Sequence, residues 1–475
     1  MRKPLFIFLA ILLGTCSKPP TLLDEIKQQG ELRVVTQFSP TTTYEGADGL
    51  EGPEYDLVKG FADFIGVELK HYTVDRFTDL IPEVQSGRAH VAASGITVTP
   101  ERMKYVDFGP VYQNVTQQLV YKRGTYKPRK LADIQGRQLV VAAGTSYIDT
   151  MQVLQNENPD FVWIEDPSSE TEDLLIQVGD GEIDFTVADS TIVRIFQNFS
   201  PGIHVAMPLG EKDNLAWAFQ KRSDSSLLDE AAQYFNYIKT NGELDRIIDR
   251  YYGHNSQFDY VGTRTFKRHI NSRLDNYADM FAAAADEVGT DWRLLAAISY
   301  QESHWNPSAI SHTGVRGLMM LTRKTAEAVN VTDRTDPEES IRGGARYLKK
   351  MHDRLSDEVP EPDRTWLALA AYNVGFGHLQ DAREIVRRQR GNPNSWLDVK
   401  QVLPMLANKE YYKDTKFGYA RGWEPVRYVD NIRTYYQILR WMPKKELPGY
   451  EAPEEPAADS ETIAAATPAK FRETG

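Results

Sequence analysis

The sequence predicts a multidomain protein with an N-terminal α/β part and a C-terminal part that is mainly α-helical. Three observations support this prediction. A chain of 475 residues is too long for a single hydrophobic core. Short apolar runs alternate with helical segments from about Leu32 to Gly253, which is typical of α/β domains. From Leu274 onward, apolar residues recur at helical spacing.

The expected strands of the N-terminal part are short runs rich in apolar residues. They lie at 32–36, 90–94, 138–143 and 184–188. With helices between them, these strands are expected to form two lobes. Two further runs, 118–122 and 215–220, are expected to be the strands that cross between the lobes.

This organisation resembles the family of periplasmic solute-binding proteins for polar amino acids. The residues that carry the resemblance are 95–102 (GITVTPER), 106–108 (VDF), 144–146 (GTS) and Asp189. The resemblance implies a two-lobed periplasmic-binding-protein fold over residues 22–255, acting as a regulatory domain. It also implies a ligand site made of Gly95, Thr97, Arg102, Thr145 and Asp189.

These residue types suit an amino acid or a short stem peptide as ligand. An α-carboxylate needs a bidentate cation with extra donors, which Arg102, Thr97, Gly95 and Thr145 can supply. An α-ammonium needs an anion, for which Asp189 is the candidate. In the alternative interpretation the lobes are only a scaffold, and Arg102 pairs with Asp107 or Glu101.

In the C-terminal part, one glutamate stands at the end of an apolar helix. Thr290 or Asp291 can cap this helix, whose apolar residues include Leu295 and Ile298. Glu302 follows Ile298 by four positions and Leu295 by seven, so its carboxyl is expected on the core-facing stripe. Desolvation there would raise its pKa above the usual value of about 4.3 and make it a proton donor. The alternative is a glutamate at a frayed helix end.

Four motifs occur in order around and after Glu302. They are 302–303 (ES), 314–319 (GVRGLM), 371–375 (AYNVG) and 427–429 (RYV). Together they resemble the lysozyme-like domain of the soluble-lytic-transglycosylase family, which implies a catalytic domain over residues 271–447 and peptidoglycan glycan strands as substrate. One position departs from the family pattern, because Met320 stands where glutamine is usual.

The resemblance implies a reaction without water. Most glycosidases use two carboxylates, but no second acid lies in the ES or GLM motifs. Glu302 would protonate the glycosidic oxygen between N-acetylmuramic acid and N-acetylglucosamine, then accept the proton of the muramyl C6 hydroxyl as its oxygen attacks C1. The product is a 1,6-anhydromuramyl end. The implied substrate-binding residues are Ser303, Met320, Tyr372, Asn373 and Tyr428; for Tyr372, packing in the helical core is the alternative.

Three classes of function are therefore open. The first is a lytic transglycosylase whose N-terminal domain senses an amino acid or a stem peptide. The second is a goose-type lysozyme, a hydrolase with a similar catalytic glutamate. The third is a non-enzymatic solute receptor with a wall-binding module, against which the intact Glu302, Ser303, Tyr372 and Asn373 speak.

The first residues predict export. Arg2 and Lys3 precede the apolar run 5–13, which matches a signal peptide over residues 1–15. Cys16, the single cysteine, resembles the lipidation site of a bacterial lipoprotein, although Thr15 is unusual before it. The resemblance implies the periplasmic face of the outer membrane; an ordinary signal peptide and an uncleaved anchor are the alternatives.

The remaining features of the sequence limit the partners, cofactors and folded segments that can be expected. A net charge of −12 with no basic stripe argues against nucleic acid. No histidine or cysteine cluster has metal-ligand spacing, so neither a metal nor another cofactor is expected. Residues 256–270 are expected to be a linker, and the Glu-, Pro- and Ala-rich residues 448–475 a disordered tail.

Overall fold

The computed structural model describes residues 19–45, 49–255, 260–311 and 314–442. The predicted signal peptide, Cys16 and the predicted tail lie outside the described residues. The chain divides into two compact units. The first comprises Met1–Lys267 and Tyr347–Tyr435, and the second comprises Arg268–Arg346 and Tyr436–Gly475.

The first lobe is built on a five-stranded sheet with the strand order β4-β1-β5-β12-β6. The central strand β1 (Glu31–Gln37) runs parallel to β4 (Glu68–Val74) and to β5 (Val91–Ala92). Strand β12 (Ala218–Gln220) is antiparallel to β5 and to β6 (Val106–Phe108). The helices of this lobe are α1 (Leu22–Gln29), α2 (Pro53–Ile65), α3 (Leu80–Gln85), α7 (Ser226–Thr240) and α8 (Glu243–Tyr252).

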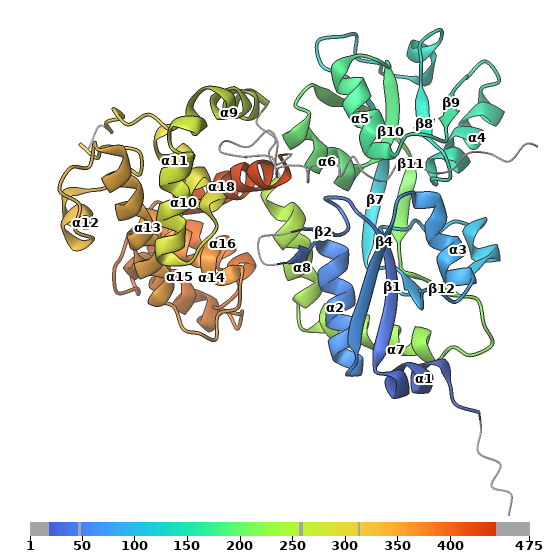
Figure 1. The fold of residues 1–475 in the computed structure, drawn as a ribbon, viewed down its shortest axis with the longest axis horizontal. Helices are drawn as coiled ribbons and strands as arrows, with labels where there is room; N and C mark the ends of the chain where they lie inside the picture. The colour runs from blue at the N-terminus through green and yellow to red at the C-terminus, as the bar shows by residue number, and fades with distance from the viewer. Residues whose placement is uncertain (1–18, 46–48, 256–259, 312–313, 443–475) are drawn as a thin grey trace, which may run out of the picture. The chain divides into compact units, whose positions relative to one another are not determined.

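The second lobe is built on a three-stranded antiparallel sheet with the order β10-β7-β11. Its strands are β10 (Phe185–Asp189), β7 (Gln113–Lys122) and β11 (Ile203–Leu215), and a parallel pair, β8 (Val140–Ala142) and β9 (Ile164–Asp166), lies beside them (Figure 1). The helices are α4 (Tyr147–Glu157), α5 (Thr171–Asp180) and α6 (Ser190–Phe199). The predicted two-lobed α/β fold is therefore confirmed.

Strands β7 and β11 are the long connections that run from one lobe into the other (Figure 1). The prediction of a crossing strand at 118–122 is confirmed, because these residues lie in β7. The prediction for 215–220 is wrong, because these residues are split between the end of β11 and β12. The crossing strand β11 is hidden in the sequence by its solvent-exposed polar residues around Glu211.

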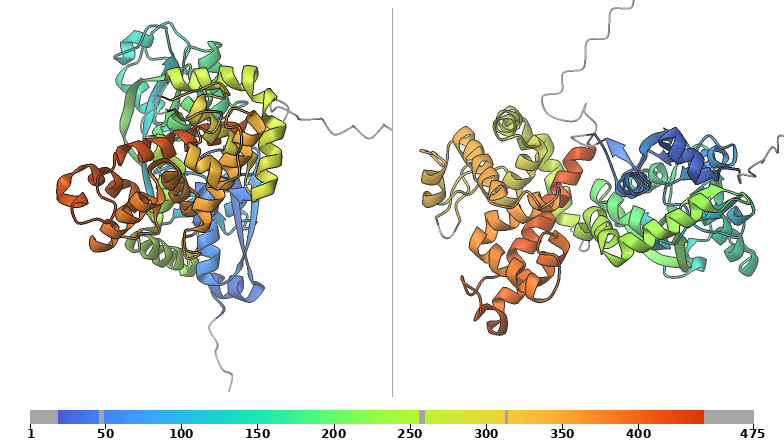
Figure 2. Two further views of the ribbon diagram at one scale, coloured as in Figure 1. Left: turned by 90° about the vertical axis from the view of Figure 1, so that its left-hand side faces the viewer. Right: turned by 90° about the horizontal axis from the view of Figure 1, so that it is seen from below.

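Helices account for most of the chain after Tyr260. In the first unit these are α14 (Asp363–Val374), α15 (Phe376–Arg388), α16 (Trp396–Val402) and α17 (Lys409–Tyr412), drawn mostly in orange in Figure 2. In the second unit they are α10 (Ala278–Val288), α11 (Trp292–Ser303) and α12 (Arg323–Ala328). Three helices have residues in both units: α9 (Tyr260–Arg273), α13 (Pro337–Asp353) and α18 (Trp423–Trp441). Within the described parts of the chain, no helix is long and apolar enough to span a lipid bilayer.

The predicted linker is partly helical. Residues 260–270 belong to α9, which continues to Arg273. The reason is that Phe266 and Ile270, four positions apart, are both buried, so the segment has an apolar side despite its many charged residues.

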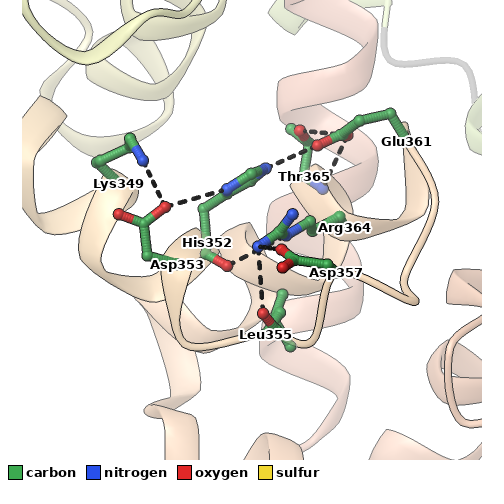
Figure 3. Close-up of polar contacts among 8 residues, drawn as sticks. All are labelled: Lys349, His352, Asp353, Leu355, Asp357, Glu361, Arg364 and Thr365. Atoms are coloured by element: carbon green, nitrogen blue, oxygen red, sulfur yellow. Dashed lines mark hydrogen bonds and ion pairs between the residues drawn. The ribbon is translucent and has the colours of Figure 1, made fainter.

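Polar contacts fix the connection between α13 and α14 (Figure 3). His352 Nε2 lies 2.7 Å from Glu361 Oε1, and the other ring nitrogen of His352 lies 3.6 Å from Asp353 Oδ1. Arg364, on α14, donates hydrogen bonds to the carbonyl oxygens of His352 (3.3 Å) and Leu355 (3.2 Å). Because these contacts cap the end of α13, they set the start of α14, the helix that carries Tyr372 and Asn373.

Candidate active site and ligand cleft

Helix α11 begins at the predicted cap and ends beside Glu302. Asp291 is the N-cap residue, and its carboxylate accepts a hydrogen bond from the backbone N–H of Arg293 at 2.9 Å. Leu295 and Ile298 are fully buried, as the apolar spacing predicts. Glu302 itself is only half-buried, although Tyr300 and Ser303 in the same last turn of the helix are buried.

The backbone after Glu302 is held in an unusual conformation. His304 and Trp305 have φ angles of 53° and 55°, in the left-handed region that non-glycine residues rarely occupy. Each such residue costs on the order of 1–3 kcal/mol and needs support from its surroundings. Trp305 supplies this support by donating its indole N–H to the carbonyl oxygen of Ala296 at 2.9 Å, and Arg273 binds the carbonyl oxygen of His304 at 2.7 Å. The turn that follows the predicted acid is therefore fixed.

Ser303 connects α11 to the loop that carries the GLM motif. Its buried hydroxyl donates to the carbonyl oxygen of Leu318 at 2.9 Å, and the hydroxyl of Ser299 donates to the same oxygen at 3.2 Å. The backbone N–H of Met319 donates to the hydroxyl of Ser340 at 3.1 Å. Since the Ser303 hydroxyl proton is directed to the chain itself, this side chain positions the loop.

Two residues of the same loop have backbone conformations that limit substitution. Gly317 has φ 87°, and a Cβ atom there would lie 1.8 Å from the carbonyl oxygen of Arg334, so only glycine fits. Met320, the residue that departs from the family pattern, has φ 45° and is half-buried. Sequence reasoning identified Met320 by its neighbours in the motif, whereas its left-handed backbone gives no signal in the sequence.

The other predicted substrate residues lie in the first compact unit. Tyr372 on α14 and Tyr428 on α18 are stacked, with ring centroids 6.4 Å apart and planes 14° apart. Tyr347, on α13, meets Tyr372 edge-on at 5.1 Å. Tyr428 is buried, Tyr372 half-buried and Asn373 exposed. The structure thus brings Tyr372 and Tyr428 together and adds Tyr347, a residue that the motifs did not indicate.

Between the two lobes lies a cleft of about 680 Å³, open solvent included. All five predicted ligand residues line this cleft; they are Gly95, Thr97, Arg102, Thr145 and Asp189. Residues far apart in the sequence therefore meet at one place, as the resemblance implies.

Arg102 provides the cation of the cleft. Its buried guanidinium donates to the carbonyl oxygens of Thr97 (2.9 Å) and Gly144 (3.0 Å), and it lies 5.1 Å from the ring centroid of Phe77. Glu101, one of its alternative partners, pairs with Lys104 instead. Among the described residues Arg102 forms no ion pair, so its charge is not neutralised at short range by a carboxylate of the chain.

Asp189 provides the anion. Its backbone N–H donates to the hydroxyl of Tyr147 at 3.1 Å, while its carboxylate oxygen Oδ1 is buried without a hydrogen-bond partner among the described residues. Burial raises the pKa of Asp189 to about 7; the charge of Asp213 adds to this rise, and Tyr147 and Arg102 oppose it. Buried acceptors are normally paired, so this oxygen requires a donor from a bound molecule or water.

A second buried carboxylate, Glu54, was missed by sequence reasoning. Glu54 lies in the first turn of α2 and accepts hydrogen bonds from the N–H of Gly95 (2.8 Å), the indole of Trp217 (3.0 Å) and the hydroxyl of Tyr112. The N–H of Gly95 is therefore directed to Glu54, while Gly95 itself lines the cleft as predicted. The hydroxyl of Thr145 is likewise directed to the chain, at the carbonyl oxygen of Ala142 (2.8 Å).

Hydrogen bonds across the cleft hold the two lobes together. The hydroxyl of Ser39, in the first lobe, donates to Glu172 Oε1, in the second, at 2.7 Å. The hydroxyl of Ser146 donates to that of Thr97 at 3.2 Å. Together with the bond from Arg102 to Gly144, these contacts show the lobes in a closed arrangement.

Comparisons with known proteins also divide the chain into an N-terminal solute-binding part and a C-terminal transglycosylase part. Residues 32–254 match the family model of bacterial extracellular solute-binding proteins, family 3, and residues 279–394 match the transglycosylase SLT domain. A membrane-bound lytic murein transglycosylase F from Pseudomonas savastanoi pv. phaseolicola is 45% identical over 442 residues, which cover 93% of this chain and 89% of that relative. The same-named protein of Saccharophagus degradans is 46% identical over 425 residues, covering 90% and 85%.

This chain belongs to the membrane-bound lytic murein transglycosylase F family.

As a member of this family, the chain is a lytic murein transglycosylase with an N-terminal solute-binding domain of family 3. The goose-type lysozyme and the non-enzymatic receptor are not supported. Among solved structures, a mutant of ArgBP from T. maritima is 27% identical and covers 49% of this chain and 99% of its own, with a TM-score of 0.43. The SLT match of this chain includes Glu302, Ser303, Met320, Tyr372 and Asn373 but ends before Tyr428.

Proposed function

We propose that Glu302 is the single acid and base of the transglycosylase reaction. The observation that carries this proposal is its place at the end of α11, half-exposed and followed by a turn that Trp305 and Arg273 fix. A fixed carboxyl that glycan can reach meets the first requirement of general acid catalysis. Glu302 would protonate the glycosidic oxygen between N-acetylmuramic acid and N-acetylglucosamine as the bond from this oxygen to the muramyl C1 breaks. It would then take the proton from the muramyl C6 hydroxyl as that oxygen bonds to C1.

Because the muramyl oxygen is the nucleophile, no second carboxylate is needed. The products end in 1,6-anhydromuramic acid instead of a reducing sugar. Mass spectrometry of sacculi digested with the full chain tests this directly. Anhydro ends are expected, and reducing ends would identify a hydrolase.

Tyr372 and Tyr428 are proposed as glycan-binding side chains, with Asn373 and Met320. Their stacking supports this role for the half-buried Tyr372, since a tyrosine held by a neighbouring ring presents a fixed face and a hydroxyl. For Ser303 the proposal changes from direct contact with the muramyl group to positioning of the GLM loop, because its hydroxyl is bound by Leu318.

The N-terminal cleft is proposed to bind the zwitterionic end of an amino acid or a stem peptide. Arg102 would bind the carboxylate with the donors that Thr97 and Gly144 leave free, and Asp189 would bind the ammonium through its unpaired oxygen. Binding would favour the closed lobes and so change the rate of glycan cleavage. Calorimetry with amino acids and muropeptides tests the first part of this proposal.

The chain is further proposed to be exported and held at the periplasmic face of the outer membrane through lipidated Cys16. The relatives are named as membrane-bound proteins, and residues 1–15 have the pattern of a signal peptide. Metabolic labelling with a fatty-acid probe, compared between the parent and Cys16→Ser, tests this attachment.

A further inference from the structure

The last turn of α8, residues 249–252, is bound to the first lobe beside the ligand cleft. Tyr252 lines the cleft, and its hydroxyl donates to the carbonyl oxygen of Thr41, another cleft residue, at 3.3 Å. The two residues before it hold Asp56: Arg250 at 2.5 Å and the hydroxyl of Tyr251 at 2.7 Å. A change in the cleft wall at Thr41 or Tyr252 therefore acts on this turn directly.

The same turn is bound on another side by two cations of the helical part, within the same compact unit. The carboxylate of Asp249 pairs with Lys400 on α16 and lies 3.6 Å from Arg433 Nη1 on α18. Arg433 also donates from Nη2 to the carbonyl oxygens of Asp249 (2.7 Å) and Arg250 (2.9 Å). Cations that bind the last carbonyls of a helix stabilise its C-terminal end.

These contacts lead to the proposed glycan-binding tyrosines. Arg433 follows Tyr428 by five positions on α18. Its guanidinium lies 5.4 Å from the ring centroid of Trp366 on α14, the helix that carries Tyr372. Tyr372, on α14, and Tyr428, on α18, stack on one another. Arg433 belongs to α18 and packs against α14, so it contacts both helices that carry these tyrosines.

We propose that residues 249–252 are a coupling turn that transmits opening and closing of the ligand cleft to α14 and α18. The proposal rests on the proposed function, in which the cleft modulates cleavage, and it names the residues that connect the two. Because one helical turn moves as a rigid piece, a shift at Tyr252 displaces Asp249 and the carbonyls that Arg433 holds. Arg433 is 3% exposed, so it has little room to move independently of this turn.

The test combines a change that opens the cleft with changes that cut the link. Glu172→Ala removes the bond from Ser39 that holds the lobes closed. Arg433→Met removes the hydrogen bonds to the carbonyl oxygens of the coupling turn, and Asp249→Asn removes the ion pairs of the turn with Lys400 and Arg433. Arg388→Met is the matched control, because it removes an arginine whose exposed ion pair is made with Glu384 on its own helix, α15, in the same unit. All variants are made in the full chain.

Two readouts are measured in the parent, the two link variants and the control, each with and without Glu172→Ala. The first is the initial rate of muropeptide release from sacculi. The second is amide hydrogen exchange of the cleft strands and of residues 423–435. In the parent and in Arg388→Met, Glu172→Ala is expected to change the cleavage rate about fivefold, the size of a typical coupling. This change is expected to vanish in Arg433→Met and to shrink in Asp249→Asn, while the cleft strands still open.

Two results would overturn the proposal in different ways. An equal effect of Glu172→Ala in all four backgrounds would show that the cleft modulates cleavage by another route. No effect in any background would overturn the modulation itself and the coupling turn with it. The two link variants change opposite partners of the pair between Asp249 and Arg433. If one variant misfolds, the other still tests the proposal.

Discussion

Ser303 and Leu318 join the helix of the predicted catalytic acid to the loop of the GLM motif. The hydroxyl of Ser303 donates to the carbonyl oxygen of Leu318 at 2.9 Å, fifteen positions away in the sequence. The donor belongs to the residue directly after Glu302. Loss of this bond would therefore change the position of the loop relative to Glu302.

For Ser303→Ala we expect a loss of about 1 kcal/mol in the free energy of unfolding and a lower kcat with little change in KM. The matched control is Ser299→Ala, because Ser299 donates to the same oxygen and is fully buried. Similar effects of the two substitutions support the positioning role. A rise in KM confined to Ser303→Ala would instead mean that Ser303 contacts the glycan. Urea unfolding and initial rates on sacculi give both quantities.

Glu302→Gln keeps the shape of the side chain but replaces the acidic carboxyl with an amide that cannot donate a proton as a general acid. We expect a folded protein whose turnover falls by at least about 100-fold, the usual contribution of general acid catalysis. Circular dichroism checks the fold, and release of muropeptides from sacculi checks the rate. Clearance of sacculi at a near-parental rate would exclude Glu302 as the acid.

Arg102→Ala removes the cation of the cleft, so we expect ligand binding to be lost. Lys104→Ala is the control, since Lys104 is a neighbouring cation that is exposed and pairs with Glu101 outside the cleft. Isothermal titration with a panel of amino acids and muropeptides compares the two variants. Binding of a panel member that persists in Arg102→Ala would show that the carboxylate site lies elsewhere.

Asp189 predicts how ligand affinity depends on pH. Its pKa is raised to about 7, so the carboxylate that pairs with an ammonium is fully formed only above that value. We expect affinity to rise as pH increases from 6 to about 8 and to stay flat for Asp189→Asn. Titrations at several pH values measure this. A rise that persists in Asp189→Asn would assign the pH dependence to another group.

The raised pKa of Asp189 has the opposite effect on the stability of the ligand-free protein, which falls as pH rises. Below the unfolded pKa of about 3.8 Asp189 is neutral in both states, and above about 7 its buried charge destabilises the fold. The difference of about three units corresponds to a destabilisation on the order of 4 kcal/mol. Asp189→Asn should therefore melt at a higher temperature than the parent at pH 8 and at a similar temperature at pH 4.

Local signals in the sequence predicted much of the fold. The cap at Asp291, the buried spacing of Leu295 and Ile298, and strands β1 and β10 all depend on residues close together in the chain. Strand β11 was missed because its polar residues are exposed and carry no alternation. Helix α9 was missed because its apolar side consists of few residues among many charges.

The parts of the site that escaped prediction depend on distant contacts. Glu54 is held by Gly95, Tyr112 and Trp217, which lie 41, 58 and 163 positions away. A glutamate after Gly-Pro looks like an ordinary first-turn acid, and only the folded lobe brings these donors to it. The left-handed backbone of Met320 has the same explanation, since surrounding contacts and not residue type impose it.

The bond from the Trp305 indole to the carbonyl oxygen of Ala296 spans nine positions, so it closes a very short loop around Glu302. Contacts of such low sequence separation form with little loss of chain entropy and at early stages of folding. The turn after Glu302, the proposed acid, is thus held in part by its own helix, in addition to the bonds that Arg273 and Leu318 supply from outside residues 296–305.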